Sequence, residues 1–151
     1  MTSELNMGKI AAIKAVREKC IELGEALVDL SRPMLDDFSL LSEIHNAYVD
    51  VFRERGCPGK AAQVYHRKKF LLVALYLYSP GTLTGERMRI GLRRELADVL
   101  NLTTGTAVSD NCASLLFHYN NSRDFRRDCG LIYRKAVEKI NIKNVNANIL
   151  H

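Results

Sequence analysis

The 151-residue sequence predicts an all-α protein of about six helices, arranged as an N-terminal two-helix arm followed by a basic helical domain. Two observations indicate this. Apolar residues recur at helical spacing through most of the chain, and no stretch keeps the alternation of a half-buried strand long enough to predict a sheet. Glycine and proline fall between these periodic segments, where they typically end helices.

The first predicted helix runs from about Gly8 to Leu30. Charged side chains occupy one face, as on a solvated surface. We expect the apolar stripe on the other face to be buried, either on the second helix or across a seam with a partner chain, which makes residues 10–30 a candidate surface for a homodimer or a protein partner. The stripe has alternating spacings of three and four residues over three heptads: Ile13, Val16, Cys20, Leu23, Leu27 and Leu30.

The second predicted helix completes the arm. Pro33 ends the first helix, and Asp36, Asp37 and Ser39 are candidate N-caps for the second. Its inward positions are Leu40, Leu41, Ile44, Tyr48, Val51 and Phe52. The densest turn chemistry in the chain, residues 56–59 (Gly-Cys-Pro-Gly), follows this helix, so we expect 1–59 to form an acidic helical hairpin and 60–140 a separate basic domain.

Charge supports the same division. Residues 60–139 carry 14 Lys and Arg against 7 Asp and Glu, whereas residues 1–59 carry 7 against 10. A basic module next to an acidic segment suggests that the module faces a polyanion, and nucleic acid is a common one.

The basic domain opens with a helix from Ala61 to about Tyr78, which is apolar nearly all round and therefore predicted to be central. Residues 82–90 are predicted to form a short hairpin or wing. Three further helices are predicted at 92–102, from Ala107, and from the N-cap Ser122 to about Ile140. The Asn-rich residues 141–151 are expected to be a weakly ordered tail.

Several classes of function are not indicated. The four cysteines are scattered without close Cys or His pairs, so we expect no metal site, and nothing implies a cofactor. No phosphate-binding loop, nucleophile elbow or metalloprotease motif is present, so we expect no enzyme. The longest apolar run is too short to cross a membrane, and the first residues lack the pattern of a secretory signal, so we expect a cytoplasmic protein.

The run from Glu95 to Leu102, with a Thr/Gly turn and then Val108 and Ser109, resembles a helix-turn-helix. In that motif a small residue, here Ala97, permits close helix crossing, and an apolar residue, here Val108, packs between the helices. The sequence departs from the usual pattern in two ways. Asn101 stands where glycine is common, and Val108 falls one position late.

Residues 67–77, a basic helix start that turns apolar, and the Thr84-Gly85 loop before the helix-turn-helix-like run loosely resemble the C-terminal domain of bacterial replication initiators. That family belongs to the Trp-repressor-like group. The resemblance covers about 55 residues and implies a similar helical layout. The family's Asp-His-Thr-Thr signature is absent, since residues 105–110 read Gly-Thr-Ala-Val-Ser-Asp, so initiator activity is not implied.

Arginine and lysine flank this motif instead of lying within it, because residues 96–122 contain none. Arginine suits phosphate contacts because its planar guanidinium donates two hydrogen bonds at once. The candidate phosphate-binding residues form three clusters: Arg67, Lys68 and Lys69; Arg87, Arg89, Arg93 and Arg94; and Arg123, Arg126 and Arg127. The candidates for reading base edges are Thr104, Thr106, Ser109 and Asn111.

The sequence thus predicts a non-enzymatic protein that binds duplex DNA mainly through phosphates, as a regulator or as an accessory factor of a replicon or mobile element. The alternative is a helical adaptor or structural subunit, in which the same motif only packs the core. RNA is a third option, but no aromatic sheet platform is predicted.

Overall fold

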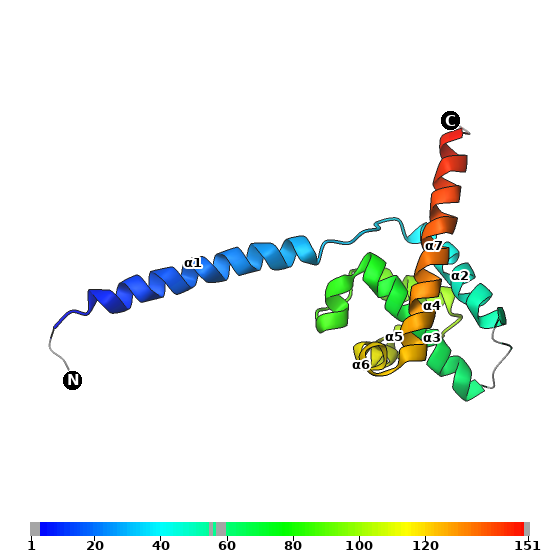
Figure 1. Ribbon diagram of the computed structural model, residues 1–151, viewed down its shortest axis with the longest axis horizontal. Coiled ribbons are helices and arrows are strands. Elements are labelled where there is room, and N and C mark those ends of the chain that lie inside the picture. The colour runs from blue at the N-terminus through cyan, green and yellow to red at the C-terminus, as the bar shows by residue number, and fades with distance from the viewer. Residues whose placement is uncertain (1–3, 55, 57–59, 150–151) are drawn as a thin grey trace. The chain divides into compact units, whose positions relative to one another are not determined.

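The computed structural model describes residues 4–54, 56 and 60–149, without the side chains of 60–62 and 145–149. Over this part of the chain it has seven α-helices, two short 3-10 helices and no strand, which confirms the all-α fold (Figure 1). The elements are α1 (Met7–Leu30), η1 (Phe38–Leu40), α2 (Leu41–Glu54), α3 (Lys60–Tyr78), η2 (Pro80–Thr84), α4 (Leu92–Val99), α5 (Gly105–Cys112), α6 (Leu115–Asn121) and α7 (Arg123–Ile149).

The chain divides into two compact units, Met1–Arg32 and Pro33–His151. The sequence predicted a division near residue 59 instead, with α2 paired to the first helix in a hairpin. The physical reason for the difference is the packing of α2, whose apolar face contacts α3 and α7. The turn that suggested the boundary includes residues 57–59, which lie outside the described residues.

α1 forms the first unit, and none of its residues is buried. Its N-cap is Asn6, whose side chain accepts a hydrogen bond from the Lys9 amide at 3.1 Å. The predicted apolar stripe is present but exposed, from 45% at Ile13 to 83% at Leu30. Inside the second unit, α2 packs its own apolar face against α3 and α7.

α3 lies at the centre of the second unit, as its composition predicts. It contacts α2, α5, α6, α7 and η2, and its residues 69–75 are all buried. The segment before α2 is fixed to the C-terminal end of α3. The amides of Met34 and Leu35 donate to the Leu77 carbonyl at 2.9 and 3.0 Å, and the Tyr78 hydroxyl donates to the Asp37 carbonyl at 2.6 Å.

Two local predictions differ from the structure. Residues 80–84 form η2, opened by Pro80, and the described residues 85–91 contain no strand, so the predicted hairpin or wing is not formed. The predicted fifth helix is two helices, α5 and α6, separated at Ala113 and Ser114.

α7 extends to Ile149, so the predicted weakly ordered tail is helical through most of its length. The extension continues a helix that packs along α2, where Ile140 is buried. Three ion pairs follow the same seam: Lys135 with Glu54 at 2.7 Å, Lys139 with Asp50 at 3.1 Å, and Lys143 with Glu43 at 3.8 Å. Their order shows that the two helices run antiparallel.

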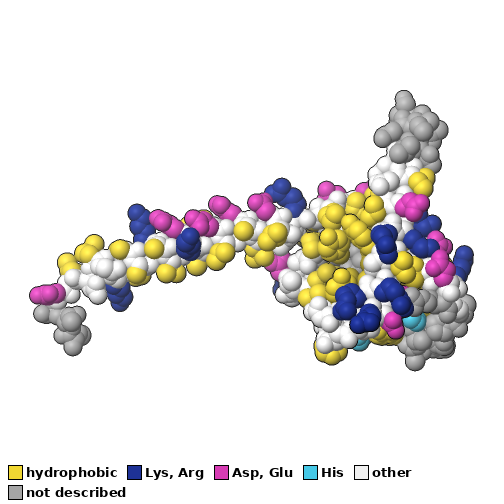
Figure 2. Space-filling model, viewed as in Figure 1, with side chains coloured by type: hydrophobic (Ala, Val, Ile, Leu, Met, Phe, Trp, Pro, Cys, Tyr) yellow, Lys and Arg dark blue, Asp and Glu magenta, His cyan; other side chains and the backbone are white. Residues whose placement is uncertain are grey.

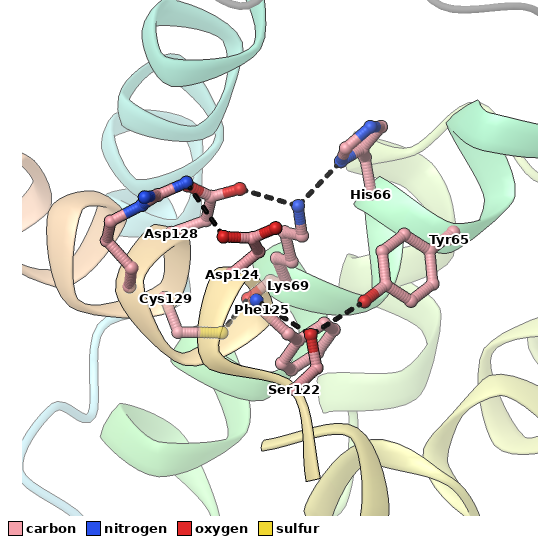
Figure 3. Close-up of polar contacts among 9 residues, drawn as sticks. Tyr65, His66, Lys69, Ser122, Asp124, Phe125, Asp128 and Cys129 are labelled. Carbon is pink, nitrogen blue, oxygen red and sulfur yellow. Dashed lines mark hydrogen bonds and ion pairs between the residues drawn. The ribbon is translucent and has the colours of Figure 1, made fainter.

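A buried ion pair joins α3 to α7. The Lys69 Nζ lies 2.6 Å from the Asp128 Oδ2, and the two side chains are only 4% and 2% exposed (Figure 3). The ammonium also lies 2.7 Å from the His66 Nδ1, which must accept because an ammonium can only donate, and 5.2 Å from the Tyr65 ring centre. The Arg127 Nε lies 4.0 Å from the other Asp128 oxygen.

We predict that Lys69→Met lowers the free energy of unfolding by about 3–5 kcal/mol, because it leaves the Asp128 carboxylate buried without its main cation. Urea unfolding followed by circular dichroism measures the loss. The double variant Lys69→Met/Asp128→Leu should recover much of it, since apolar side chains then replace the whole pair. Losses that simply add would contradict this account.

We also predict that the protein loses stability below about pH 6.5 in part through His45. Burial lowers the pKa of this half-buried ring, which lies edge-on to Phe70 at 5.4 Å. The unfolded chain therefore takes up the proton more readily than the folded protein, and stability falls as pH decreases below the ordinary value of 6.5. His45→Phe should reduce the decrease in unfolding free energy between about pH 7 and about pH 5. An unchanged pH dependence in urea titrations would contradict it.

Candidate nucleic-acid interface

α4 and α5 form a pair of short helices joined by residues 100–104, and they pack against each other. Ala97 and Val108, the two residues expected between the helices, are both buried. The Leu102 amide donates to the Ala97 carbonyl at 2.8 Å, which closes the end of α4. Asn101 adopts a left-handed φ of 55°, so its side chain occupies a turn position where glycine is common and asparagine is tolerated.

Three of the four candidate base-reading residues are exposed on α5 or at its N-cap. Thr104, Thr106 and Ser109 are exposed, and Thr104 makes no side-chain capping hydrogen bond. Asn111 is different, because it is half-buried and its Nδ2 donates to the Ala107 carbonyl at 2.6 Å. The geometry therefore favours the three hydroxyl residues over Asn111 as groups that can reach a ligand.

Arg93, an exposed residue in the first turn of α4, contacts α5 with its side chain. Its Nη1 donates to the Ser109 Oγ at 3.4 Å. A Cβ added to Gly105, the first residue of α5, would lie 3.0 Å from the Arg93 Cγ and Nε. Glycine at the start of α5 therefore allows the Arg93 side chain to lie against the helix.

The first basic cluster is largely used inside the domain. Lys69 is buried in its ion pair with Asp128, so it cannot extend to a phosphate. The Lys68 Nζ donates to the Ser114 Oγ at 2.9 Å and is partly buried. The Arg67 Nε is enclosed without a hydrogen-bond partner among the described residues, although the residue as a whole is half-buried.

Only part of the second basic cluster is accessible. Arg89 stabilises the fold, since its guanidinium donates to the Leu35 carbonyl at 3.0 Å and pairs with Asp36 at 2.9 Å. Arg87 and Arg94 are exposed and form no ion pair with the described residues. Together with Arg93 they form the accessible part of this cluster, just before and within the first turn of α4.

Only part of the third basic cluster is free of contacts that stabilise the domain. The Arg126 Nη1 donates to the carbonyls of Tyr119 and Asn120, at 2.8 and 3.3 Å, and so satisfies the end of α6. Arg127 pairs with Asp124 at 3.1 Å. Arg123 is exposed and pairs with no carboxylate in the described part of the chain.

The sequence interpretation missed Arg134 because it lies apart from the three clusters. It is exposed on α7, and its Nε donates only to the carbonyl of Gly130, at 3.3 Å. Figure 2 shows several Lys and Arg side chains on the face of the second unit that α7 crosses. A surface charge pattern, not a sequence motif, is the signal that identifies such a residue.

Three other features describe the chemistry of this part of the chain. The described residues contain no group of three or more His, Cys, Asp or Glu that could hold a metal ion. Burial raises the pKa of Cys112 to about 11 and that of Cys129 to about 12, so both remain protonated thiols. A cavity of about 360 Å³ between α3, η2, α6 and α7 is lined mostly by apolar and tyrosine side chains, among them Leu72, Tyr76 and Tyr133.

Comparisons with protein-family models, curated proteins and solved structures give no match for this chain. No described helix has an apolar stretch long enough to cross a membrane. The function is therefore inferred from the geometry of the domain itself.

We predict that Asn101→Gly keeps or slightly raises the stability of the domain, whereas Asn101→Val lowers the free energy of unfolding by about 1–2 kcal/mol. The reason is the left-handed φ of 55°, which glycine adopts freely and a β-branched residue does not. Thermal or urea unfolding of the two variants measures the difference. Equal stability of the two would show that the turn does not hold this conformation in solution.

Proposed function

We propose that residues 33–151 bind duplex DNA without catalysing a reaction, mainly through contacts from arginine to phosphate. The three accessible arginines near α4, Arg87, Arg93 and Arg94, are the primary phosphate-binding residues in this proposal. The exposed hydroxyls of Thr104, Thr106 and Ser109 supply limited contacts to base edges. A role as a regulator or as an accessory factor of a replicon or mobile element is the corresponding biological proposal.

The proposal depends on which basic residues remain accessible. Some basic side chains are paired with groups of the domain itself, whereas others are exposed and have no such partner in the described part of the chain. All of the formal charge of +5 belongs to residues 33–151, which have 17 Lys and Arg against 12 Asp and Glu. Near α4, Arg89 is held by Asp36, whereas Arg87 and Arg94 have no carboxylate partner among the described residues. Unpaired guanidinium groups beside a pair of short helices suit phosphate binding.

The main rival is a helical adaptor that contacts an acidic protein partner. The DNA-binding proposal and the adaptor alternative differ in the affinity for duplex DNA that they predict. Phosphate binding releases counterions from the duplex, so affinity should fall steeply with salt, and it should depend little on sequence. RNA binding would instead show a preference for single strands or loops.

We predict that Arg93→Ala/Arg94→Ala weakens binding to all duplexes by a similar factor. It should also reduce the slope of log K against log salt by roughly 0.9 for each lost phosphate contact. Fluorescence anisotropy with short labelled duplexes of unrelated sequence, measured over a series of salt concentrations, gives both quantities. Thr106→Ala/Ser109→Ala should change the salt slope little and alter only the discrimination between sequences.

Arg32→Ala is the matched control, because Arg32 lies outside residues 33–151 and is paired with Asp29 at 3.0 Å. It should leave affinity and slope nearly unchanged. A wild-type chain that binds no duplex at low ionic strength would overturn the proposal in favour of the adaptor. A strong preference for single-stranded RNA would also contradict it.

A further inference from the structure

The exposed apolar stripe of α1 is the largest feature that the proposed function does not use. Its six positions span three heptads, and the helix has no buried residue. Leu23, near the middle, is 69% exposed. Most helices in proteins are stabilised by packing an apolar face, so a 24-residue helix with this stripe lacks the contact that its sequence encodes.

We infer that the α1 helices of two copies of this chain pair antiparallel along the stripe. The distribution of charge along α1 favours this orientation. In residues 7–17 of α1 all charged side chains are basic, whereas in residues 18–30 all but one are acidic (Figure 2). The basic residues are Lys9, Lys14 and Arg17 in the first half and Lys19 in the second, and the acidic residues are Glu18, Glu22, Glu25 and Asp29. Only an antiparallel pair places each basic half beside an acidic half.

The charged residues along the two edges of the apolar stripe also favour the antiparallel pair. Lys19 and Glu22 lie on the same edge, where they form an ion pair at 3.5 Å within one helix. Heptad spacing places Lys14 and Arg17 on the other edge. An antiparallel two-fold axis brings like edges together, so Lys19 of one copy faces Glu22 of the other. A parallel pair would bring unlike edges together, so Lys19 would face Gly24 of the other copy and gain no acidic partner there.

The charge of the second unit also favours the antiparallel pair. Residues 33–151 follow the C-terminal end of α1 and carry the whole charge of +5. A parallel pair would bring the two copies of this unit to the same end of the helices, where like charges repel. In the antiparallel pair the two units follow opposite ends of helices that are about 36 Å long.

The stripe is also symmetrical enough for this arrangement. In one register Ile13 packs against Leu30, Val16 against Leu27, and Cys20 against Leu23 of the other copy, so every layer is apolar. Between Ile13 and Leu30 no charged residue falls at a core position, which agrees with a continuous seam over this part of the helix. This inference is independent of DNA binding, since it depends only on α1.

Light scattering of the full chain after size exclusion tests the pairing. The wild type should have twice the monomer mass, and Leu23→Glu should raise the dimer dissociation constant at least about a hundredfold, because it places two carboxylates in an apolar seam. Ala11→Glu is the matched control, since it adds a glutamate on the opposite face and should leave the dimer intact. A monomeric wild type, or a dimer that Leu23→Glu does not weaken, overturns the inference.

Disulfide trapping tests the orientation. In full chains that carry Cys20→Ala and Cys57→Ala, Ile13→Cys alone and Leu30→Cys alone should form little cross-linked dimer on oxidation, whereas a re-equilibrated mixture of the two should form it readily. The reason is that residue 13 approaches residue 30 of the other copy, and not its own counterpart. Efficient cross-linking of each variant by itself would establish a parallel pair and overturn the inference.

Discussion

The ion pair between Lys69 and Asp128 is the constraint on which the second unit depends. Its two charges lie almost fully inside the domain, and removing either from water costs several kcal/mol unless the other stays in contact. α3 and α7 must therefore pack in the one register that brings the two residues together. That register also places two phenylalanines in the core: Phe70, next to Lys69, and Phe125, about one turn before Asp128.

Other ion pairs determine which basic residues remain available. Close to α7 and α2, cations are used to hold helices together, as in the pairs of Lys135 with Glu54 and Lys139 with Asp50. Near the start of α4 the acidic partners are fewer, and only Arg89 is held, by Asp36. Arg87, Arg93 and Arg94 are exposed beside α4, and the functional proposal is therefore centred on them and not on the whole basic sequence.

Sequence reasoning predicted what depends on local pattern. It identified α3 as central because the helix is apolar nearly all round, and it identified Ala97 and Val108 as the packing residues of α4 and α5. It could not predict contacts between distant residues. Lys69 looks like part of a solvated basic cluster with its two neighbours, and only Asp128, 59 residues later, gives it a buried partner. The Asn-rich end of α7 likewise looks weak until Lys143 is placed beside Glu43.

The most direct test of the account is a nuclear magnetic resonance titration of the arginine Nε–H groups with a short duplex at low salt. If the proposed DNA binding is correct, we expect the signals of Arg87, Arg93 and Arg94 to shift when the duplex binds. They should return to their positions in the free protein as salt is added. The signals of Arg89 and Arg126, which are held by Asp36 and by the carbonyls at the end of α6, should stay nearly unchanged. Shifts confined to Arg126 and Arg127, or no shift at any arginine, would contradict it.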